Sequence, residues 1–180
     1  FWYDCVYNVK SRYTSTRWRS YDMWNGYYTW ISNVNYILAE EETMSGSETE
    51  KNYVLGQAYA VRAYSYFMLA QMFSRTYKGH ESEPCVPLYT EPTDIATEGK
   101  GRATVEEVYQ QITSDLDKAI TMLGNSGKRK HISHINEAVA SGIKARVALV
   151  MEDWQTALDA ANAAISKSGC SIGTGTAVTG

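Results

Sequence analysis

The sequence predicts an all-α fold built from antiparallel helix pairs that are joined by long loops. Apolar residues recur three and four positions apart in several segments, the spacing that places them on one face of a helix. Only 3 of the 180 residues are proline, so few positions interrupt a helix. With 44% hydrophobic residues the chain can bury a core, and we expect residues 1–180 to form a single helical domain.

The first two helices are predicted from their apolar positions. A broad apolar face begins near Tyr21 and continues to Leu38, which indicates one amphipathic helix. Residues 40–51 are acidic and contain Ser and Gly, so they predict a turn. Residues 52–73 are apolar nearly all round, as expected of a helix that is covered on several sides.

Three further helices complete the predicted fold. Thr104 and Glu107 have the spacing of a capping box, which opens a helix that runs to about Leu123. Residues 134–151 and 153–166 form the last pair, joined by a very short turn, and small residues recur along both. This pair resembles a tetratricopeptide repeat, in which small residues let two helix backbones approach closely.

Three regions lack helical periodicity. Residues 1–20 are rich in Tyr, Trp, Ser and Arg, and residues 74–102 hold all three prolines, so we expect both to be loop-rich. A loop as long as 74–102 is usually functional or disordered in a compact domain. Residues 167–180 are expected to be an irregular end.

Composition and spacing exclude several classes of function. The net charge is -3 and no basic run is present, so nucleic acid is not an expected partner. The three cysteines are far apart, and His131 and His134 have no carboxylate at a matching spacing, so no metal site is expected. Asp115 and Asp117 flank one residue and point in different directions, so they do not form an acid/base pair. We expect neither an enzyme nor a cofactor.

Arg62 is the one charge inside an almost wholly apolar helix. A buried guanidinium is costly unless it is paired, so we expect a structural ion pair with Asp115 or Glu106. A role in ligand binding is the alternative.

Several segments, in order, resemble the SusD-like (RagB/SusD) family of outer-membrane glycan-binding lipoproteins. They cover about residues 24–165, and they are Trp24-xxx-Tyr28-xx-Ile31-xxx-Asn35-xx-Leu38, Gly56-Gln57-Ala58 with Val61-Arg62-Ala63-Tyr64-Ser65-Tyr66-Phe67 and Met72-Phe73, Val86-Pro87-Leu88, Arg102-Ala103-Thr104-Val105-xx-Val108-Tyr109-xx-Ile112-xx-Asp115-Leu116-xx-Ala119-Ile120, and Lys144-Ala145-Arg146-Val147-Ala148-Leu149 with Trp154-xx-Ala157.

The resemblance implies a tetratricopeptide-like binding protein, lipid-anchored on the cell surface at a bacterial outer membrane. It implies that oligosaccharides, or peptides in some members, are captured and delivered to a TonB-dependent (SusC-like) transporter. The chain would be the N-terminal-to-middle part of such a protein. Contact with the membrane would be made only through a lipid anchor upstream of Cys5, which has no lipobox around it.

Sugars present flat apolar faces and hydroxyl edges, so a binding site needs aromatic rings beside polar donors and acceptors. Aromatic residues on helical stripes are expected to pack in the core, and these are Trp154, Tyr109, Tyr64 and Tyr66. Aromatic residues in the two loop-rich regions are the candidate ligand-binding residues, with ordinary packing as the alternative for each: Trp18, Tyr77, Trp2, Tyr3, Tyr13 and Tyr89.

Trp18 and Tyr77 are favoured among these candidates because charged or polar donors lie next to them in the sequence. The main rival to glycan capture is a repeat scaffold that binds a peptide or protein partner in its groove. Exposed aromatic residues on loops would favour sugar, and a polar groove lined by helices would favour peptide.

Overall fold

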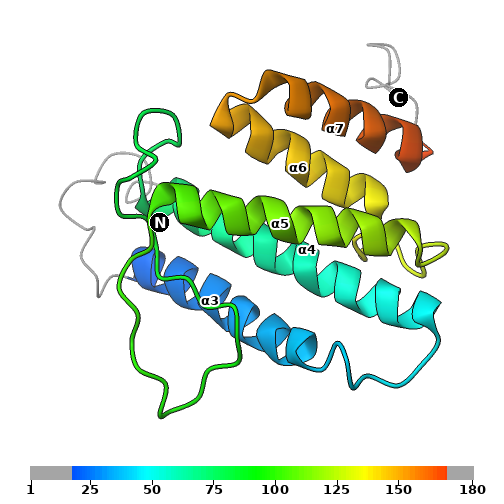
Figure 1. Ribbon diagram of the computed structural model, residues 1–180, viewed down its shortest axis with the longest axis horizontal. Helices are drawn as coiled ribbons and strands as arrows, with labels where there is room; N and C mark the ends of the chain where they lie inside the picture. The colour runs from blue at the N-terminus through cyan, green and yellow to red at the C-terminus, as the bar shows by residue number, and fades with distance from the viewer. Residues whose placement is uncertain (1–17, 170–180) are drawn as a thin grey trace.

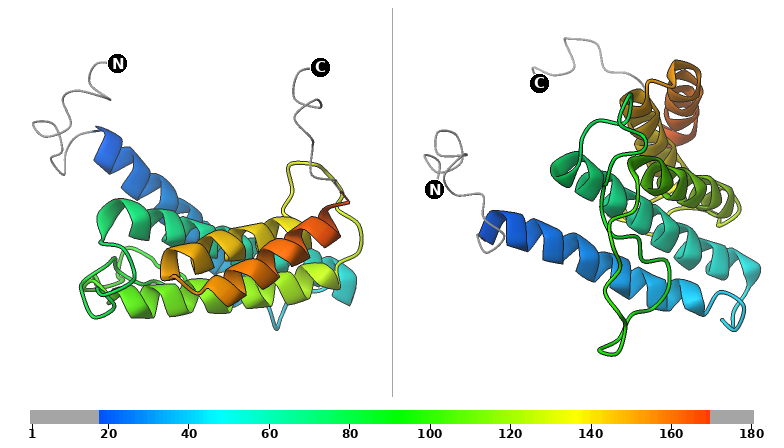
Figure 2. Two further views of the ribbon diagram at one scale, coloured as in Figure 1. Left: turned by 90° about the horizontal axis from the view of Figure 1, so that it is seen from above. Right: turned by 60° about the vertical axis from the view of Figure 1, so that its left-hand side comes forward.

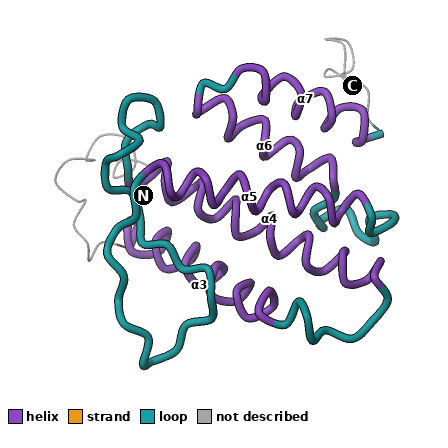
Figure 3. Tube along the Cα trace, viewed as in Figure 1, coloured by secondary structure: helices purple, strands orange, loops and turns teal. Residues whose placement is uncertain are grey.

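The computed structural model describes residues 18–169, with side chains from residue 22 onward. Within this range the chain forms helices and loops and no strand, with a single isolated bridge between Pro84 and Thr104 (Figure 3). The helices are α3 (Trp18–Ala39), α4 (Glu48–Phe73), α5 (Val105–Gly124), α6 (Glu137–Met151) and α7 (Trp154–Ser168). The prediction of an all-α fold is confirmed.

Each helix runs antiparallel to the one before it in the sequence (Figure 1). The helix α4 lies between α3 and α5 and contacts both, α6 packs on α5, and α7 packs on α6 (Figure 2). The predicted antiparallel pairing of the last two helices is confirmed. They are joined by Glu152, in the left-handed conformation at φ 60°, and by Asp153, whose side chain caps α7.

Side-chain caps place the first residues of α4 and α5. The Thr104 hydroxyl accepts a hydrogen bond from Glu107 N (3.2 Å), and the Glu107 carboxylate accepts one from Thr104 N (2.7 Å), which confirms the predicted capping box. Ser47 and Glu50 form a second capping box of the same kind, with both distances 3.3 Å. The expectation that residues 40–51 are all turn is therefore wrong, because this cap starts α4 at Glu48.

Two other predicted helix starts are also corrected. The helix α3 begins at Trp18 and not near Tyr21, so residues 18–20 are helical and do not belong to the preceding segment. The helix α6 begins at Glu137 and not at 134, because the Asn136 side chain accepts from Val139 N (3.0 Å) and ends the loop there.

The core lies mainly between α4 and α5 and receives side chains from α3 and α6. Tyr66 and Tyr109 are fully buried and Tyr64 is half-buried, in line with their predicted packing. Trp154 is 63% exposed, so its predicted place in the core is wrong. Among the described helices α7 contacts only α6, and it does so through small residues, which leaves the indole at its first position uncovered.

Candidate functional site

The proline-bearing loop between α4 and α5 folds back on itself at its base. Cys85 N donates to Ala103 O (2.7 Å) and Ala103 N donates to Val86 O (3.1 Å), so the two ends of the loop run side by side. The part between them leaves the ends of α4 and α5 and crosses the face of α3 (Figures 1 and 2). This crossing brings loop residues next to α3 side chains that are about 55 positions away in the sequence.

Three consecutive carbonyl groups of this loop are bound by side chains of α3 and α4. The amide nitrogen of Asn35 donates to Tyr89 O and to Glu91 O, both at 3.0 Å. Arg62 donates to the carbonyl of Thr90 (3.1 Å), and the Tyr66 hydroxyl lies 2.7 Å from both Tyr89 O and Tyr89 N. The backbone of residues 89–91 is thus fixed from inside the fold.

Arg62 also makes the predicted ion pair with Asp115. The guanidinium binds the carboxylate through two hydrogen bonds, from Nε to Oδ2 (2.7 Å) and from Nη2 to Oδ1 (2.8 Å), and Arg62 is only 5% exposed. Burial acts to lower the pKa of Arg62, but the hydrogen bonds and the charge of Asp115 outweigh it and the pKa is raised. Of the two predicted partners, Asp115 is confirmed and Glu106 is not.

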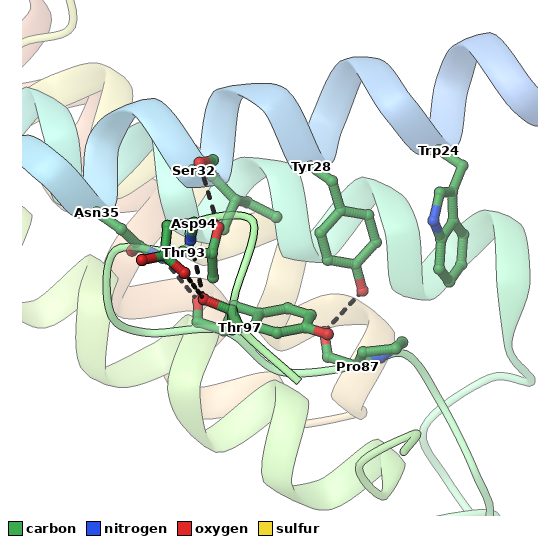
Figure 4. Close-up of a pocket in the computed structure, with 10 residues that line it drawn as sticks. Trp24, Tyr28, Ser32, Asn35, Pro87, Thr93, Asp94 and Thr97 are labelled. Atoms are coloured by element: carbon green, nitrogen blue, oxygen red, sulfur yellow. Dashed lines mark hydrogen bonds between the residues drawn. The ribbon is translucent and has the colours of Figure 1, made fainter. Parts of the chain in front are cut away.

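A pocket of about 310 Å³ opens between α3 and this loop (Figure 4). Three aromatic rings and five polar side chains contribute to its wall, together with two aliphatic residues. The lining residues are Trp24, Tyr28, Ile31, Ser32, Asn35, Pro87, Tyr89, Thr93, Asp94 and Thr97.

The aromatic side of the pocket is held rigidly. Trp24 packs against Tyr28 with their ring centroids 4.9 Å apart, and it meets Phe73 edge-on at 5.0 Å. The Tyr28 hydroxyl donates to Pro87 O (2.7 Å), and burial raises the pKa of Tyr28 above its ordinary value, so the phenol stays neutral. The Tyr89 ring lies edge-on to Tyr28 at 6.1 Å.

The polar side of the pocket comes from Ser32 and Asn35 of α3 and from loop residues (Figure 4). The hydroxyl groups of Ser32 and Thr93 are 3.5 Å apart. Asp94 uses Oδ1 to accept from Ala96 N (2.9 Å) and from the Thr97 hydroxyl (3.0 Å). The pocket therefore offers flat apolar surfaces beside hydroxyl and carboxylate groups.

The predicted site residues are not all brought together. Tyr89 lines the pocket, whereas Tyr77 lies elsewhere, half-buried with its ring 5.1 Å from that of Tyr109. Trp18 is the first residue of α3, which corrects its predicted place in the loop before that helix, and its side chain is outside the described part. The predictions for Trp2, Tyr3 and Tyr13 fall on residues outside the described range.

Sequence reasoning missed the α3 residues of the pocket. The spacing of Trp24, Tyr28 and Asn35 fits one stripe of a helix, which predicts that they pack in the core and does not mark them as pocket residues. One signal was present: Asn35 is a polar residue inside that stripe, and it is 1% exposed because it binds the loop carbonyls.

Two kinds of feature are absent from the described residues. Residues 18–169 contain no group of three or more His, Cys, Asp or Glu side chains that could hold a metal ion. In the same part of the chain, each helix is too short or too polar to span a membrane.

Several solved structures from Bacteroides are similar to this chain. A SusD superfamily protein from Bacteroides thetaiotaomicron VPI-5482 is 30% identical, with a TM-score of 0.72 over 81% of this chain and 32% of that one. A putative sugar binding protein from Bacteroides vulgatus ATCC 8482 is 30% identical, with a TM-score of 0.74 over 80% and 32%. A SusD-like carbohydrate binding protein from the same strain is 26% identical, with a TM-score of 0.78 over 91% and 37%.

This chain thus spans about a third of the length of these solved relatives. No curated protein matches it. Residues 2–149 match the SusD-like family that is described as "Starch-binding associating with outer membrane". That match extends over most of the 180 residues, and the chain belongs to the SusD-like family.

Proposed function

We propose that the protein captures oligosaccharides at the surface of a bacterial outer membrane and binds them without chemical change. The pocket between α3 and the proline-bearing loop carries the proposal, because it sets aromatic rings beside hydroxyl and carboxylate groups. The family description supports it, and so do two similar structures, which are of a putative sugar binding protein and of a SusD-like carbohydrate binding protein.

The physical fit is between a sugar ring and the two sides of the pocket. The indole of Trp24 and the ring of Tyr89 can cover the apolar C–H face of a pyranose ring. Asp94 and Thr97 then lie where hydroxyl groups at the edge of the sugar need acceptors, because the Thr97 hydroxyl already donates its proton to Asp94. A volume of about 310 Å³ is at the lower end for ligand pockets, which suits one or two sugar units of a longer chain.

Delivery of the bound sugar is the second part of the proposal. The protein would be lipid-anchored on the cell surface and would pass its ligand to a TonB-dependent (SusC-like) transporter. The SusD-like family membership supports this part of the proposal.

Three measurements test the proposal on the full-length protein. A glycan array should identify a neutral oligosaccharide, and calorimetric titration with that glycan should give an affinity that falls when Asp94 is replaced by Ala. If the protein delivers its ligand, a pull-down with the tagged protein from detergent-solubilised outer membranes should recover the transporter. Absence of the transporter from that pull-down would argue against delivery. Glycan binding that is unchanged in Asp94→Ala would remove the pocket from the proposal, and no binding to any glycan would contradict capture itself.

The rival function, a repeat scaffold for a peptide or protein partner, also has one observation in its favour. A second hollow, between α3 and α6, is lined by helices, although its wall is apolar where a peptide groove was expected to be polar. Screening a displayed peptide library against the full-length protein, with the glycan as competitor, distinguishes the two functions. Peptides that bind whether or not the glycan is present would favour the scaffold, and the absence of any bound peptide would favour glycan capture.

A further inference from the structure

The wall of the pocket between α3 and the proline-bearing loop carries charge of one sign. Of the described residues that line it, Asp94 is the one acidic residue, and none is Lys, Arg or His. Figure 4 shows the Asp94 carboxylate on the loop side of the pocket, near Thr97. A ligand that enters therefore meets an anion, and the described wall offers it no cation in return.

The two segments that form the pocket are also acidic. Residues 87–100 of the loop contain two further carboxylates besides that of Asp94, against a single ammonium group, that of Lys100. Residues 22–39 of α3 contain one charged side chain, and it is acidic too. The charges around the pocket thus add to the field of Asp94 and do not cancel it.

Two described cations lie close to the pocket, and both already have partners. The ammonium group of Lys100 lies 5.3 Å from the centre of the Tyr89 ring and donates to Leu88 O (3.2 Å). The Arg62 guanidinium lies behind the wall, and its charge is balanced by the two hydrogen bonds that it makes to the carboxylate of Asp115. Neither cation lines the pocket, so neither is placed to bind an anionic group of a ligand.

We propose that the pocket selects sugars by charge, an inference that rests on the proposed function. It takes sugar units that are neutral or that carry an amino group, and it rejects units that carry a carboxylate or a sulfate. Asp94 is the residue that determines this choice.

A uronic acid shows why charge and not shape makes the difference. It keeps the C–H face of the neutral hexose, so it can still stack on Trp24 and Tyr89. It carries a carboxylate at C6 where the neutral sugar has a hydroxyl group. A hydroxyl group can donate to Asp94, whereas a carboxylate accepts only and is repelled by the like charge.

The repulsion is large enough to measure although Asp94 is exposed. Two unit charges that are 4 Å apart in bulk water change a binding constant by about 5-fold, and the factor grows as the ligand displaces water. Dissolved salt screens such a repulsion, because the screening length falls from about 30 Å at 0.01 M to about 3 Å at 1 M. A choice made by charge therefore weakens as salt is added, and a choice made by shape does not.

The test compares paired ligands on the full-length protein. Neutral oligosaccharides of glucose, of mannose and of galactose are each paired with the same oligosaccharide oxidised at C6 to the uronic acid. Calorimetric titration gives both dissociation constants at about 0.01 M and about 1 M salt. For a pair that binds, the acidic member should have a dissociation constant about 5-fold higher or more at low salt, and the ratio should fall at high salt.

The variant Asp94→Asn assigns the choice to one side chain. It keeps an oxygen that can accept from Ala96 N and from the Thr97 hydroxyl, but it removes the charge. The ratio of the two dissociation constants should fall toward one, whatever the change in the affinity for the neutral sugar. Glu98→Gln is the matched control, because it removes the same charge from the same loop outside the wall, and it should leave most of the ratio in place.

The outcomes separate this inference from the proposed function. Equal binding of the two members of a pair, tighter binding of the acidic member, or a ratio that does not change with salt would overturn selection by charge and leave capture of oligosaccharides standing. A ratio that Asp94→Asn and Glu98→Gln lower equally would overturn the role of Asp94. Binding of neither member of any pair would contradict the proposed function and this inference together.

Discussion

Arg62 of α4 and Asp115 of α5 form a buried, two-pronged ion pair, and the same guanidinium reaches α3 and the proline-bearing loop. Its Nη1 donates to Asn35 Oδ1 (2.8 Å) and to Thr90 O (3.1 Å), while Nε and Nη2 bind the carboxylate. One side chain thus connects three helices to the backbone that shapes the pocket. The pair positions the candidate site from beneath, without lining it.

Replacing Arg62 by Ala should therefore destabilise the protein by about 3–5 kcal/mol, because it leaves a buried carboxylate without its cation. Among the described residues, Asp115 would keep the hydrogen bond from Gln111 (2.8 Å) and no other side-chain donor. The measurement is urea unfolding of the full-length protein. A double variant, Arg62→Met with Asp115→Leu, should recover much of the loss since no charge is then stranded, and equal instability of both variants would contradict the ion-pair explanation.

Asn35→Ala should loosen the loop at a smaller cost. It removes the donor to Tyr89 O and Glu91 O and the acceptor for Arg62, and unpaired buried polar groups cost about 1–3 kcal/mol. Amide hydrogen exchange of residues 89–97 should speed up. Tyr36→Phe is the matched control, because it removes one exposed hydrogen bond to the same loop, to Thr93 O (2.8 Å), and should change stability by less than about 0.5 kcal/mol. Exchange that is equally fast in both variants would contradict this role of Asn35.

Gly56 allows α4 and α5 to approach closely. A Cβ at this position would lie 2.8 Å from Leu123 Cγ and 3.2 Å from Leu123 N, so Gly56→Ala should cost about 1–3 kcal/mol through overpacking. At Gly26 in α3, no atom of the described residues lies within 4 Å of an added Cβ, so Gly26→Ala should instead stabilise by up to about 1 kcal/mol through helix propensity. Thermal unfolding of the two variants should show shifts of opposite sign, and shifts of the same sign would contradict the close approach.

The two capping boxes should add to the dependence of stability on pH. Hydrogen bonds from Ser47 lower the pKa of Glu50, and those from Thr104 lower the pKa of Glu107. Because each folded-state pKa lies below the unfolded value of about 4.3, this stability is present above that value and is lost as the pH falls through the folded-state pKa. Between about pH 6 and pH 2, the double variant Glu50→Gln with Glu107→Gln should show a flatter curve of melting temperature against pH than the parent protein. Parallel curves would rule out this contribution.

The helices were predictable because each carries its own local signal. The stripe in α5 and its capping box at Thr104 are both visible in the sequence, and its predicted start is confirmed. The start of α4 was missed although Ser47 and Glu50 have the same spacing, because the acidic residues around them also fit a turn. Local sequence patterns thus predicted the presence of each helix more accurately than they predicted the residue at which it begins.

The candidate pocket was only partly predictable because its two sides are distant in the sequence. Tyr89 was found from its place in the loop, but no local pattern shows that this loop crosses α3 next to Trp24. Burial of Arg62 and its pairing with Asp115 were predictable, since a charge in an apolar helix needs a partner. The contact of Arg62 with Thr90 O was not predictable, because it depends on how the loop folds.

Trp24→Ala should weaken oligosaccharide binding by about 1–3 kcal/mol, by analogy with the stacking of nucleic-acid bases on aromatic side chains. The indole lines the pocket, so its loss removes the surface on which a sugar ring would lie. Calorimetric titration of the full-length protein gives the affinity, and the melting temperature is measured alongside because Trp24 also packs on Phe73. Trp154→Ala is the matched control, since it removes an indole that is 63% exposed on α7 and should leave the affinity unchanged.

The variant Tyr77→Ala distinguishes two locations for the bound sugar: the region around Tyr77, which the sequence predicts, and the pocket between α3 and the proline-bearing loop. If Tyr77 binds the sugar, its loss should lower the affinity by a similar amount with little change in melting temperature. Its ring lies 5.1 Å from that of Tyr109 at the edge of the core, so we expect the melting temperature to fall and the affinity to hold once the folded fraction is taken into account. An affinity loss in Tyr77→Ala with none in Trp24→Ala would move the sugar from the α3 pocket to the region of the loop around Tyr77.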